Sequence, residues 1–118
     1  MEHSKSMAEL EDHVLQVGGI ALNEARYDVR CNNRSIYLTL SEFRLLARLM
    51  NAPGQVVSRE CLLETIANGS IVCSHNLDVR VSRLRKKLGH DGRAIVTVKG
   101  EGYKIVNTLQ GLAPKLSH

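Results

Sequence analysis

The most regular pattern of hydrophobic and polar positions in the chain runs from Ser74 to Leu88. Aliphatic side chains recur there at spacings of four, three and four, which places them on one stripe of an α-helix: Leu77, Val81, Leu84 and Leu88. Ser74 is suited to the N-cap of this helix, and Gly89 is suited to the position just after its end. The pattern therefore predicts an amphipathic helix with one face in a core.

The opposite face of this helix carries mostly polar and basic side chains: His75, Asn76, Val79, Ser82, Arg83 and Lys86. Arg80 and Lys87 lie on one flank of that face, and Arg85 lies on the other. Such a helix needs a hydrophobic core on one side and favours an anionic partner on the other.

Two more helices are predicted before it. The first opens with the capping box of Thr39 and Glu42, has a wide apolar face and is stopped by Ala-Pro-Gly at residues 52–54. Ser58 is suited to cap the second helix, residues 59–68. Three helices with a short connection between the last two outline a helix-turn-helix.

Short β-like segments precede the helices. Residues 14–23, 26–32 and 35–40 carry apolar positions between Gly and Asn breaks, which predicts a small antiparallel sheet of three or four strands. Asn32 and Asn33 favour a tight hairpin because Asn tolerates a positive φ.

A β-hairpin is predicted after the basic helix and a turn at residues 90–93. Residues 94–98 and 103–106 are rich in β-branched side chains, and they flank a glycine-bracketed tip at residues 99–102. Upstream, Val56-Val57 suits one short strand between the first two helices.

Length and composition indicate one globular domain. The 118 residues are 43% hydrophobic, which argues against global disorder. We expect a domain over residues 13–107, preceded at 1–12 by a disordered linker or residues left from expression and followed at 108–118 by a flexible tail. The sequence has no apolar run of membrane-span length and no secretory signal, so a cytoplasmic protein without a membrane partner is expected.

Basic charge is concentrated in one part of the chain. The net charge is +4, yet residues 74–104 alone hold eight Lys or Arg and three acidic residues. The rest of the chain is therefore close to neutral, which is typical of a protein with a polyanion-binding face. The alternative is that these cations merely solvate a surface helix.

Candidate catalytic and metal-binding groups are sparse. The three cysteines, Cys31, Cys61 and Cys73, form no C-x-x-C pair, so we expect reduced thiols and no structural zinc. Cys73 lies two residues from His75, which leaves a metal-dependent redox sensor as an alternative. No carboxylate pair, nucleophile with a base, or phosphate loop stands out, so we expect no enzyme activity, cofactor or metal.

Taken together, the predicted elements form an α+β winged helix: three helices, of which the last is basic and faces outward, and a hairpin directly after it. An α-helix fits the major groove of B-DNA, where arginine can bond bidentately to guanine. A basic hairpin beside it can reach backbone phosphates or the minor groove. This combination favours DNA binding over a merely solvated face.

Four segments carry a resemblance to a known family: LTLSEFRLLARLM, GQVVSRECLLE, LDVRVSRLRKKLG and TVKGEGYKI. In this order and spacing they resemble the winged-helix effector domain of OmpR/PhoB-type response regulators, over about residues 15–106. The resemblance implies an N-terminal antiparallel four-stranded sheet, three helices and a C-terminal β-hairpin wing. It also implies sequence-specific binding of promoter DNA, as a homodimer on repeats, to regulate transcription in a two-component system.

The resemblance also implies roles for individual residues. The segment 75–87 would be the recognition helix, with Arg83 as the main base reader. Near phosphates or flanking bases it would place Arg80, Ser82, Arg85 and Lys86. Lys99 would enter the minor groove, Thr97 and Tyr103 would contact phosphates, and Asp78 would position the helix.

The chain departs from the family pattern at three places. The wing has Lys99 instead of the usual Arg and carries Glu101 at its tip. Ala67 stands where an aromatic residue is common, and residues 69–74 lack acids, in the region that contacts RNA polymerase in the family. A receiver domain is absent from these residues, which favours an excised effector domain over atypical regulation.

One further class of function stays open. A winged-helix module could use its basic face to bind an acidic partner protein, and Glu101 and the apolar pair Ile71-Val72 are compatible with that role. Competition between cognate and scrambled DNA separates this class from a sequence-reading transcription factor.

Overall fold

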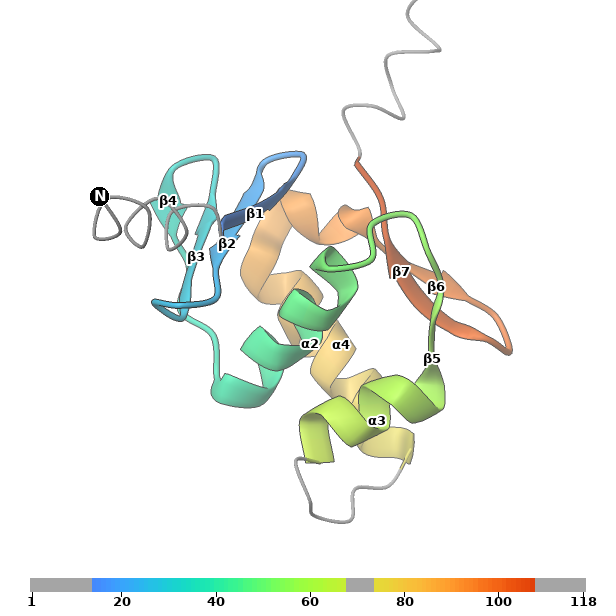
Figure 1. Ribbon diagram of the computed structural model, residues 1–118. Helices are drawn as coiled ribbons and strands as arrows, with labels where there is room; N and C mark the ends of the chain where they lie inside the picture. Colours follow the sequence, from blue (N-terminus) through green and yellow to red (C-terminus); the bar gives the residue numbers. More distant parts are fainter. Residues whose placement is uncertain (1–13, 68–73, 108–118) are drawn as a thin grey trace, which may run out of the picture.

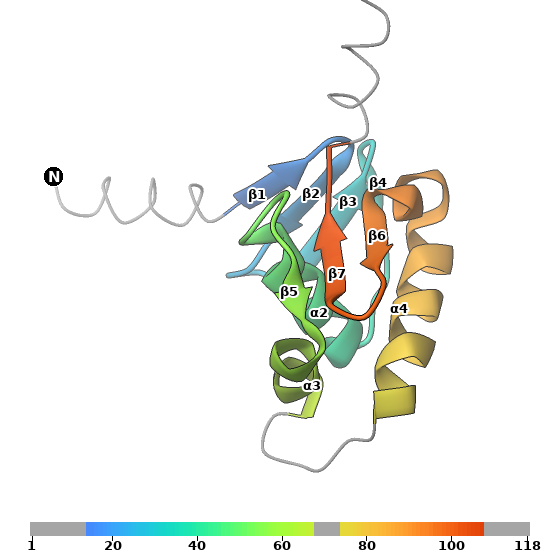
Figure 2. The ribbon, with the colours of Figure 1, turned by 90° about the vertical axis from the view of Figure 1, so that its right-hand side faces the viewer.

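Two small antiparallel sheets enclose the helices of this protein. The structure, a computed structural model, describes residues 14–67 and 74–107, except for the side chains of residues 74 and 75. The N-terminal sheet lies on one side, the helices in the centre and the C-terminal sheet on the other side (Figure 1). A view turned by 90° shows helix α2 between the two sheets and α4 along one edge of the molecule (Figure 2).

The N-terminal sheet consists of four strands in sequence order: β1 (Val14–Val17), β2 (Ile20–Asn23), β3 (Asp28–Cys31) and β4 (Arg34–Ser35). All neighbours pair antiparallel. The tight turn predicted at Asn32-Asn33 is confirmed, since both residues have positive φ, 51° and 69°. Buried apolar side chains from β2 and β3, Ile20, Leu22 and Val29, form the inner face of this sheet.

The strand predicted over residues 35–40 is wrong beyond its first residue. Only Ser35 lies in a strand, residues 36–39 run on without strand structure, and Leu40 already begins α2 (Leu40–Met50). The physical reason is the capping box, in which Thr39 accepts a bond from the Glu42 N–H and the Glu42 carboxylate accepts one from the Thr39 N–H. Local capping therefore overrides the β-like alternation of apolar residues.

The two remaining helices are α3 (Arg59–Ala67) and α4 (Ser74–Leu88). Ser58 caps α3 as predicted, because its Oγ accepts a bond of 3.1 Å from the Cys61 N–H. The predicted last residue of that helix, Asn68, lies outside the described residues. Beyond α4, Gly89 has a positive φ of 65°, which is the geometry predicted for the end of this helix.

The core forms where one face of each helix meets both sheets. The predicted stripe of α4 is confirmed, since Leu77, Val81, Leu84 and Leu88 are all buried. The broad apolar face of α2 joins the same core through buried side chains: Phe43, Leu45, Leu46, Ala47, Leu49 and Met50. Burying so many aliphatic side chains supplies most of the stabilising free energy.

The C-terminal sheet has the strand order β5-β7-β6: β5 is Val57–Ser58, β6 is Ile95–Val98 and β7 is Gly102–Ile105. The predicted hairpin is therefore confirmed, although β6 begins one residue later than predicted and β7 is shifted by one residue toward the tip. The predicted strand at Val56-Val57 is shifted by one residue, since Val56 is exposed and lies outside β5. The turn predicted at residues 90–93 is part of a 3₁₀ helix, η1 (Gly89–Ala94).

The described cysteines, Cys31 and Cys61, are both free thiols. Cys31 is buried, and burial raises the pKa of its thiol to about 11, helped by the charge of Asp91 and a hydrogen bond with it. Asp91 also accepts a 3.0 Å bond from the side-chain amide of Asn32, which ties η1 to the N-terminal sheet. Nowhere in the described ranges do three His, Cys, Asp or Glu side chains group as a metal site would require. In the same ranges, no helix combines the length and apolarity needed to cross a bilayer.

The buried environment of Cys31 leads to a prediction about the reaction rate of its thiol. In a Cys61→Ser, Cys73→Ser variant, we expect the remaining thiol to react slowly with a thiol reagent at pH 8, because few molecules carry the thiolate when the pKa is about 11. The rate is expected to rise as the pH approaches that value. Unfolding in guanidinium is the control and is expected to make the reaction fast. Fast reaction of the folded variant at pH 8 would contradict the buried environment.

Candidate nucleic-acid interface

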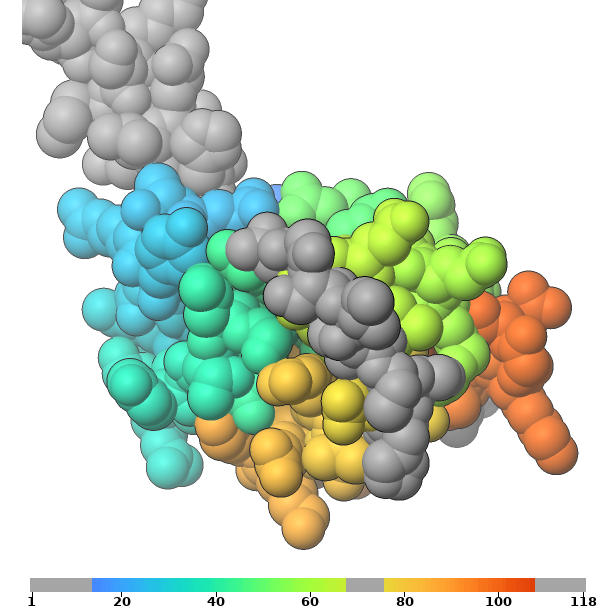
Figure 3. Space-filling model, turned by 90° about the horizontal axis from the view of Figure 1, so that it is seen from below, coloured from blue at the N-terminus to red at the C-terminus, as the bar shows by residue number. Residues whose placement is uncertain are grey.

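The outward face of α4 forms an exposed ridge between two flanking segments. Asn76, Ser82, Arg83 and Lys86 are exposed on this ridge, opposite the buried stripe. Seen from below, the yellow and orange atoms of α4 lie between the teal atoms of the segment leading into α2 and the red-orange atoms of the hairpin (Figure 3). A long partner lying across α4 would meet all three surfaces.

Two cations hold the flank of α4 that faces α2. Arg80 donates from Nη1 to the Ser41 Oγ at 2.9 Å, and Lys87 donates from Nζ to the Glu42 Oε1 at 2.7 Å. Glu42 is only 3% exposed, so its carboxylate needs this partner inside the protein. Arg80 and Lys87 therefore fix the position of α4 against the start of α2.

The pKa of Glu42 reflects this arrangement. Burial alone would raise it, but the hydrogen bonds from Lys87 and from the Thr39 N–H, together with the charge of Lys87, outweigh burial and lower the pKa. A carboxyl with a lowered pKa in the folded state stabilises the protein above its unfolded pKa. That contribution is lost as the pH falls through the lowered value.

The opposite flank of α4 is held by Arg85. Its guanidinium donates to the Ile95 carbonyl from Nε at 3.1 Å and from Nη2 at 2.9 Å, and Nη2 also donates to the Thr97 Oγ1 at 2.9 Å. The same guanidinium lies 5.7 Å from the centre of the Tyr103 ring, within the range of a cation–π contact. Arg85 thereby links α4 to the hairpin.

One carboxylate connects three elements near the start of α4. Asp78 accepts bonds of 2.9 and 3.0 Å from Nη1 and Nη2 of Arg59, the first residue of α3. Asp78 Oδ1 also accepts a short bond from the hydroxyl of Tyr103 in β7. The cluster of Arg59, Asp78 and Tyr103 ties α3, α4 and the hairpin together, which fits the positioning role expected for Asp78.

The pKa of Tyr103 is raised in this cluster. Burial is the main cause, the hydrogen bond and the negative charge of Asp78 raise the pKa further, and Arg59 partly offsets them. Arg59 has a raised pKa, chiefly because its guanidinium is hydrogen-bonded to Asp78. Both groups are therefore held in their protonated forms at neutral pH.

The tip of the hairpin projects Lys99, Gly100 and Glu101 into solvent. At its base, Gly102 has a φ of 156° and is pressed against strand β5. A Cβ atom at this position would overlap the carbonyl oxygen of Val57, so only glycine lets β5 and β7 approach. The glycine fixes the angle at which the tip leaves the sheet.

The structure sorts the predicted site residues by accessibility. Those exposed are Asn76, Ser82, Arg83, Lys86, Lys87, Thr97 and Lys99. Val79, Arg80 and Arg85 are half-buried, and Tyr103 is 4% exposed with its hydroxyl engaged by Asp78. The side chain of His75 lies outside the described residues. Four of the predicted site residues also make contacts that stabilise the fold: Arg80, Arg85, Lys87 and Tyr103. Their contacts with a ligand stay predictions.

The roles of Arg59, Glu42 and Ser41 as partners of α4 were not predicted from the sequence. A signal existed for Arg59, because a cation at the first position of a helix faces the unfavourable end of the helix dipole and suggests an acidic partner. No local signal identified Asp78 as that partner, nor Lys87 as the partner of Glu42.

Comparison with known protein families identifies the family of this chain. The family model described as "Transcriptional regulatory protein, C terminal" matches residues 33–105. The chain belongs to this family. Its members include the effector domains of the OmpR/PhoB type, so the resemblance found in the sequence is confirmed.

Individual relatives agree with this assignment. The sensory transduction protein RegX3 of Mycobacterium tuberculosis is 37% identical over 102 residues, which cover 83% of this chain and 45% of RegX3. The response regulator DrrB of Thermotoga maritima, an OmpR/PhoB homologue, matches with a TM-score of 0.71 and 30% identity over 79% of this chain and 44% of DrrB. The chain therefore spans less than half the length of these two relatives.

A third relative is a solved complex. The DNA-binding domain of RstA from Klebsiella pneumoniae, in complex with the RstA box, matches with a TM-score of 0.70 and 26% identity. The match covers 80% of this chain and 97% of that domain. The predicted α+β winged-helix fold, with its four-stranded sheet, three helices and hairpin wing, is thus confirmed.

The ion pair between the buried Glu42 and the more exposed Lys87 leads to a prediction about stability. Lys87→Met leaves the buried carboxylate without its cation, and we expect the free energy of unfolding to fall by about 1–2 kcal/mol in urea titrations. Because the pKa of Glu42 then rises, acid unfolding is expected to begin at a higher pH. Lys86→Met removes the same charge from the exposed ridge and is the matched control. Equal stability of the two variants would contradict a structural role for Lys87.

The cluster of Arg59, Asp78 and Tyr103 leads to a prediction about the pKa of Tyr103. In a Tyr27→Phe, Tyr37→Phe background Tyr103 is the only tyrosine, and its ionisation can be followed by ultraviolet absorbance. Adding Asp78→Asn removes the negative charge, so we expect the pKa of Tyr103 to fall, while burial keeps it above the ordinary value. The free energy of unfolding is expected to drop by about 0.5–1 kcal/mol, the range for a partly exposed ion pair. An unchanged tyrosine titration would exclude the contact.

Proposed function

We propose that this chain binds double-stranded DNA sequence-specifically, as the effector domain of a response-regulator transcription factor. In this proposal the ridge of α4 enters the major groove, and the hairpin lies over the adjacent minor groove. The complex of the RstA domain with its box supports the proposal by similarity of fold. A cytoplasmic location and regulation of transcription belong to the same proposal, in line with the names of the relatives.

The main support for the proposal is that some cations of α4 are bonded within the fold and others are exposed. Arg80, Lys87 and Arg85 form hydrogen bonds within the fold. Arg83 and Lys86 are exposed on a helix that these bonds hold on both flanks. A rigid helix with an exposed arginine in mid-ridge suits bidentate recognition of guanine in the major groove. Lys86 and Lys99 suit backbone contacts, which supply affinity that falls steeply with salt.

Arg83 provides the decisive test. Selection from a pool of random duplexes identifies a preferred site, and affinities are then measured by fluorescence anisotropy for that site and for a scrambled duplex. We expect Arg83→Ala to weaken binding to the preferred site by about 1–3 kcal/mol and to reduce discrimination against the scrambled duplex.

Arg26→Ala is the matched control, since Arg26 is an exposed arginine in the turn between β2 and β3. This variant removes the same charge and is expected to leave discrimination unchanged. If the two variants bind both duplexes alike, Arg83 does not read bases. Strong binding without any preferred sequence would favour the alternative of an acidic protein partner for the basic face.

Assembly on DNA is a finer part of the proposal. We expect two copies to bind repeated half-sites, because promoter repeats and homodimers are implied by the resemblance to OmpR/PhoB-type domains. Contact with RNA polymerase stays a prediction, since residues 69–73 of the implicated loop lie outside the described residues.

A further inference from the structure

The tip of the hairpin carries two opposite charges close together in the sequence. Lys99 and Glu101 are both exposed, and only Gly100 separates them. Glu101 is the only acidic residue in the segment 94–106. In the part of the chain that the structure describes, neither of the two charged side chains forms an ion pair. The tip therefore has no net charge, although the face to which it belongs is basic.

The backbone of Glu101 is held on both sides. Its N–H donates to the Val98 carbonyl at 2.9 Å, which closes a turn, and its carbonyl accepts a 3.3 Å bond from the Arg59 N–H at the start of α3. Gly100, the third residue of this turn, has a φ of 79°, which glycine adopts without strain. The guanidinium of Arg59 bonds to Asp78 and not to Glu101. The carboxylate of Glu101 thus extends from a fixed point of the backbone toward whatever the hairpin approaches.

A negative charge at the tip has a different effect in different minor grooves. Tracts of A·T pairs have a narrow minor groove, whose enhanced negative potential attracts an inserted cation. The same potential repels a carboxylate, and two opposite unit charges at similar depth nearly cancel each other. Segments rich in G·C pairs favour A-like geometry, whose minor groove is wide and shallow, so the repulsion is weaker there. A tip that carries both charges therefore lacks the usual electrostatic preference for narrow grooves.

We propose that Glu101 is a specificity-determining residue, which makes the hairpin disfavour a narrow, A·T-rich minor groove next to the site that α4 reads. This inference rests on the proposed function, in which the hairpin lies over a minor groove. Discrimination arises because the disfavoured duplex is repelled, so Glu101 needs no contact with a base. Lys99 attracts the phosphates of either kind of flank and adds affinity without this choice.

The test uses two duplexes that share the selected site and differ only in their flanks, which are runs of adenine in one and G·C pairs in the other. Affinities are measured by fluorescence anisotropy. For Glu101→Gln, we expect the affinity for the A·T-flanked duplex to rise about three- to tenfold and that for the G·C-flanked duplex to rise by no more than about twofold. Glu101→Lys is expected to shift the preference further toward the A·T flanks. Both changes affect an exposed side chain, so the fold is expected to be retained.

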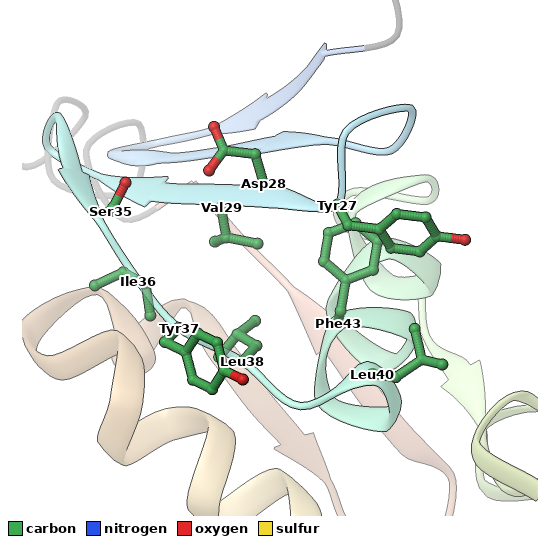
Figure 4. A pocket seen from close by; sticks show the side chains of 9 residues that line it. All are labelled: Tyr27, Asp28, Val29, Ser35, Ile36, Tyr37, Leu38, Leu40 and Phe43. Atoms are coloured by element: carbon green, nitrogen blue, oxygen red, sulfur yellow. The ribbon is translucent and has the colours of Figure 1, made fainter.

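Glu24→Gln is the matched control, since Glu24 is an exposed acid in the turn 24–27 between β2 and β3. Figure 4 shows the end of this turn, Tyr27, beside an open groove that Tyr37 and Phe43 also border. The N-terminal sheet, to which the turn belongs, and the hairpin lie on opposite sides of the helices (Figure 1). The control variant removes the same charge and is expected to leave the ratio of the two affinities unchanged.

Three results for Glu101→Gln would overturn the proposed role. An equal gain on both flanks would mean that the charge acts without regard to the groove, and an unchanged affinity for both would mean that Glu101 lies away from the DNA. A loss of affinity for the G·C flanks would mean that the carboxylate accepts a bond from the DNA. In each case the proposed function stands if Arg83→Ala still reduces discrimination against the scrambled duplex. If the wild-type protein binds no duplex, both proposals fail together.

Discussion

Burial of the aliphatic stripe of α4 is the constraint on which the rest of the structure depends. Leu77, Val81, Leu84 and Leu88 enter the core, and the helix geometry then leaves the opposite side chains in solvent. The packing of α2, α3 and both sheets around this stripe determines where the outward ridge points. A basic surface and a hydrophobic core are thus produced by the same fifteen residues.

Hydrophobic burial alone leaves α4 free to roll and slide by small amounts, because apolar contacts are not directional. The polar contacts on its flanks remove that freedom. Glu42 fixes Lys87, Ser41 fixes Arg80, and the hairpin fixes Arg85 through directional hydrogen bonds. Asp78 adds a further anchor near the start of the helix, where α3 and the hairpin converge. Such bonds matter for a recognition surface, since small misplacements of a reading side chain weaken bidentate recognition.

Sequence reasoning succeeded where the signal is local. The capping box at Thr39, the tight turn at Asn32-Asn33 and the stripe of α4 depend on residues a few positions apart, and all were predicted correctly. The strand expected over residues 35–40 failed because helix capping competes with β alternation in the same residues. The contact between Lys87 and Glu42 joins residues 45 positions apart. It could not be predicted, because sequence spacing carries no information about packing between elements. For the same reason Arg80, Arg85 and Lys87 were predicted only as ligand contacts, although the structure shows that they also bind α2 and the hairpin.

The separation of holding and reading side chains on α4 has a consequence for how this domain can diversify. Ser82, Arg83 and Lys86 are exposed on the outward face of α4, so we expect their exchange to have little effect on stability. Arg80, Arg85 and Lys87 are constrained by their partners in α2 and the hairpin. Target preference can therefore drift through mutation while the scaffold is retained. A lineage that duplicates such a domain can acquire new regulatory targets without first having to rebuild a stable fold.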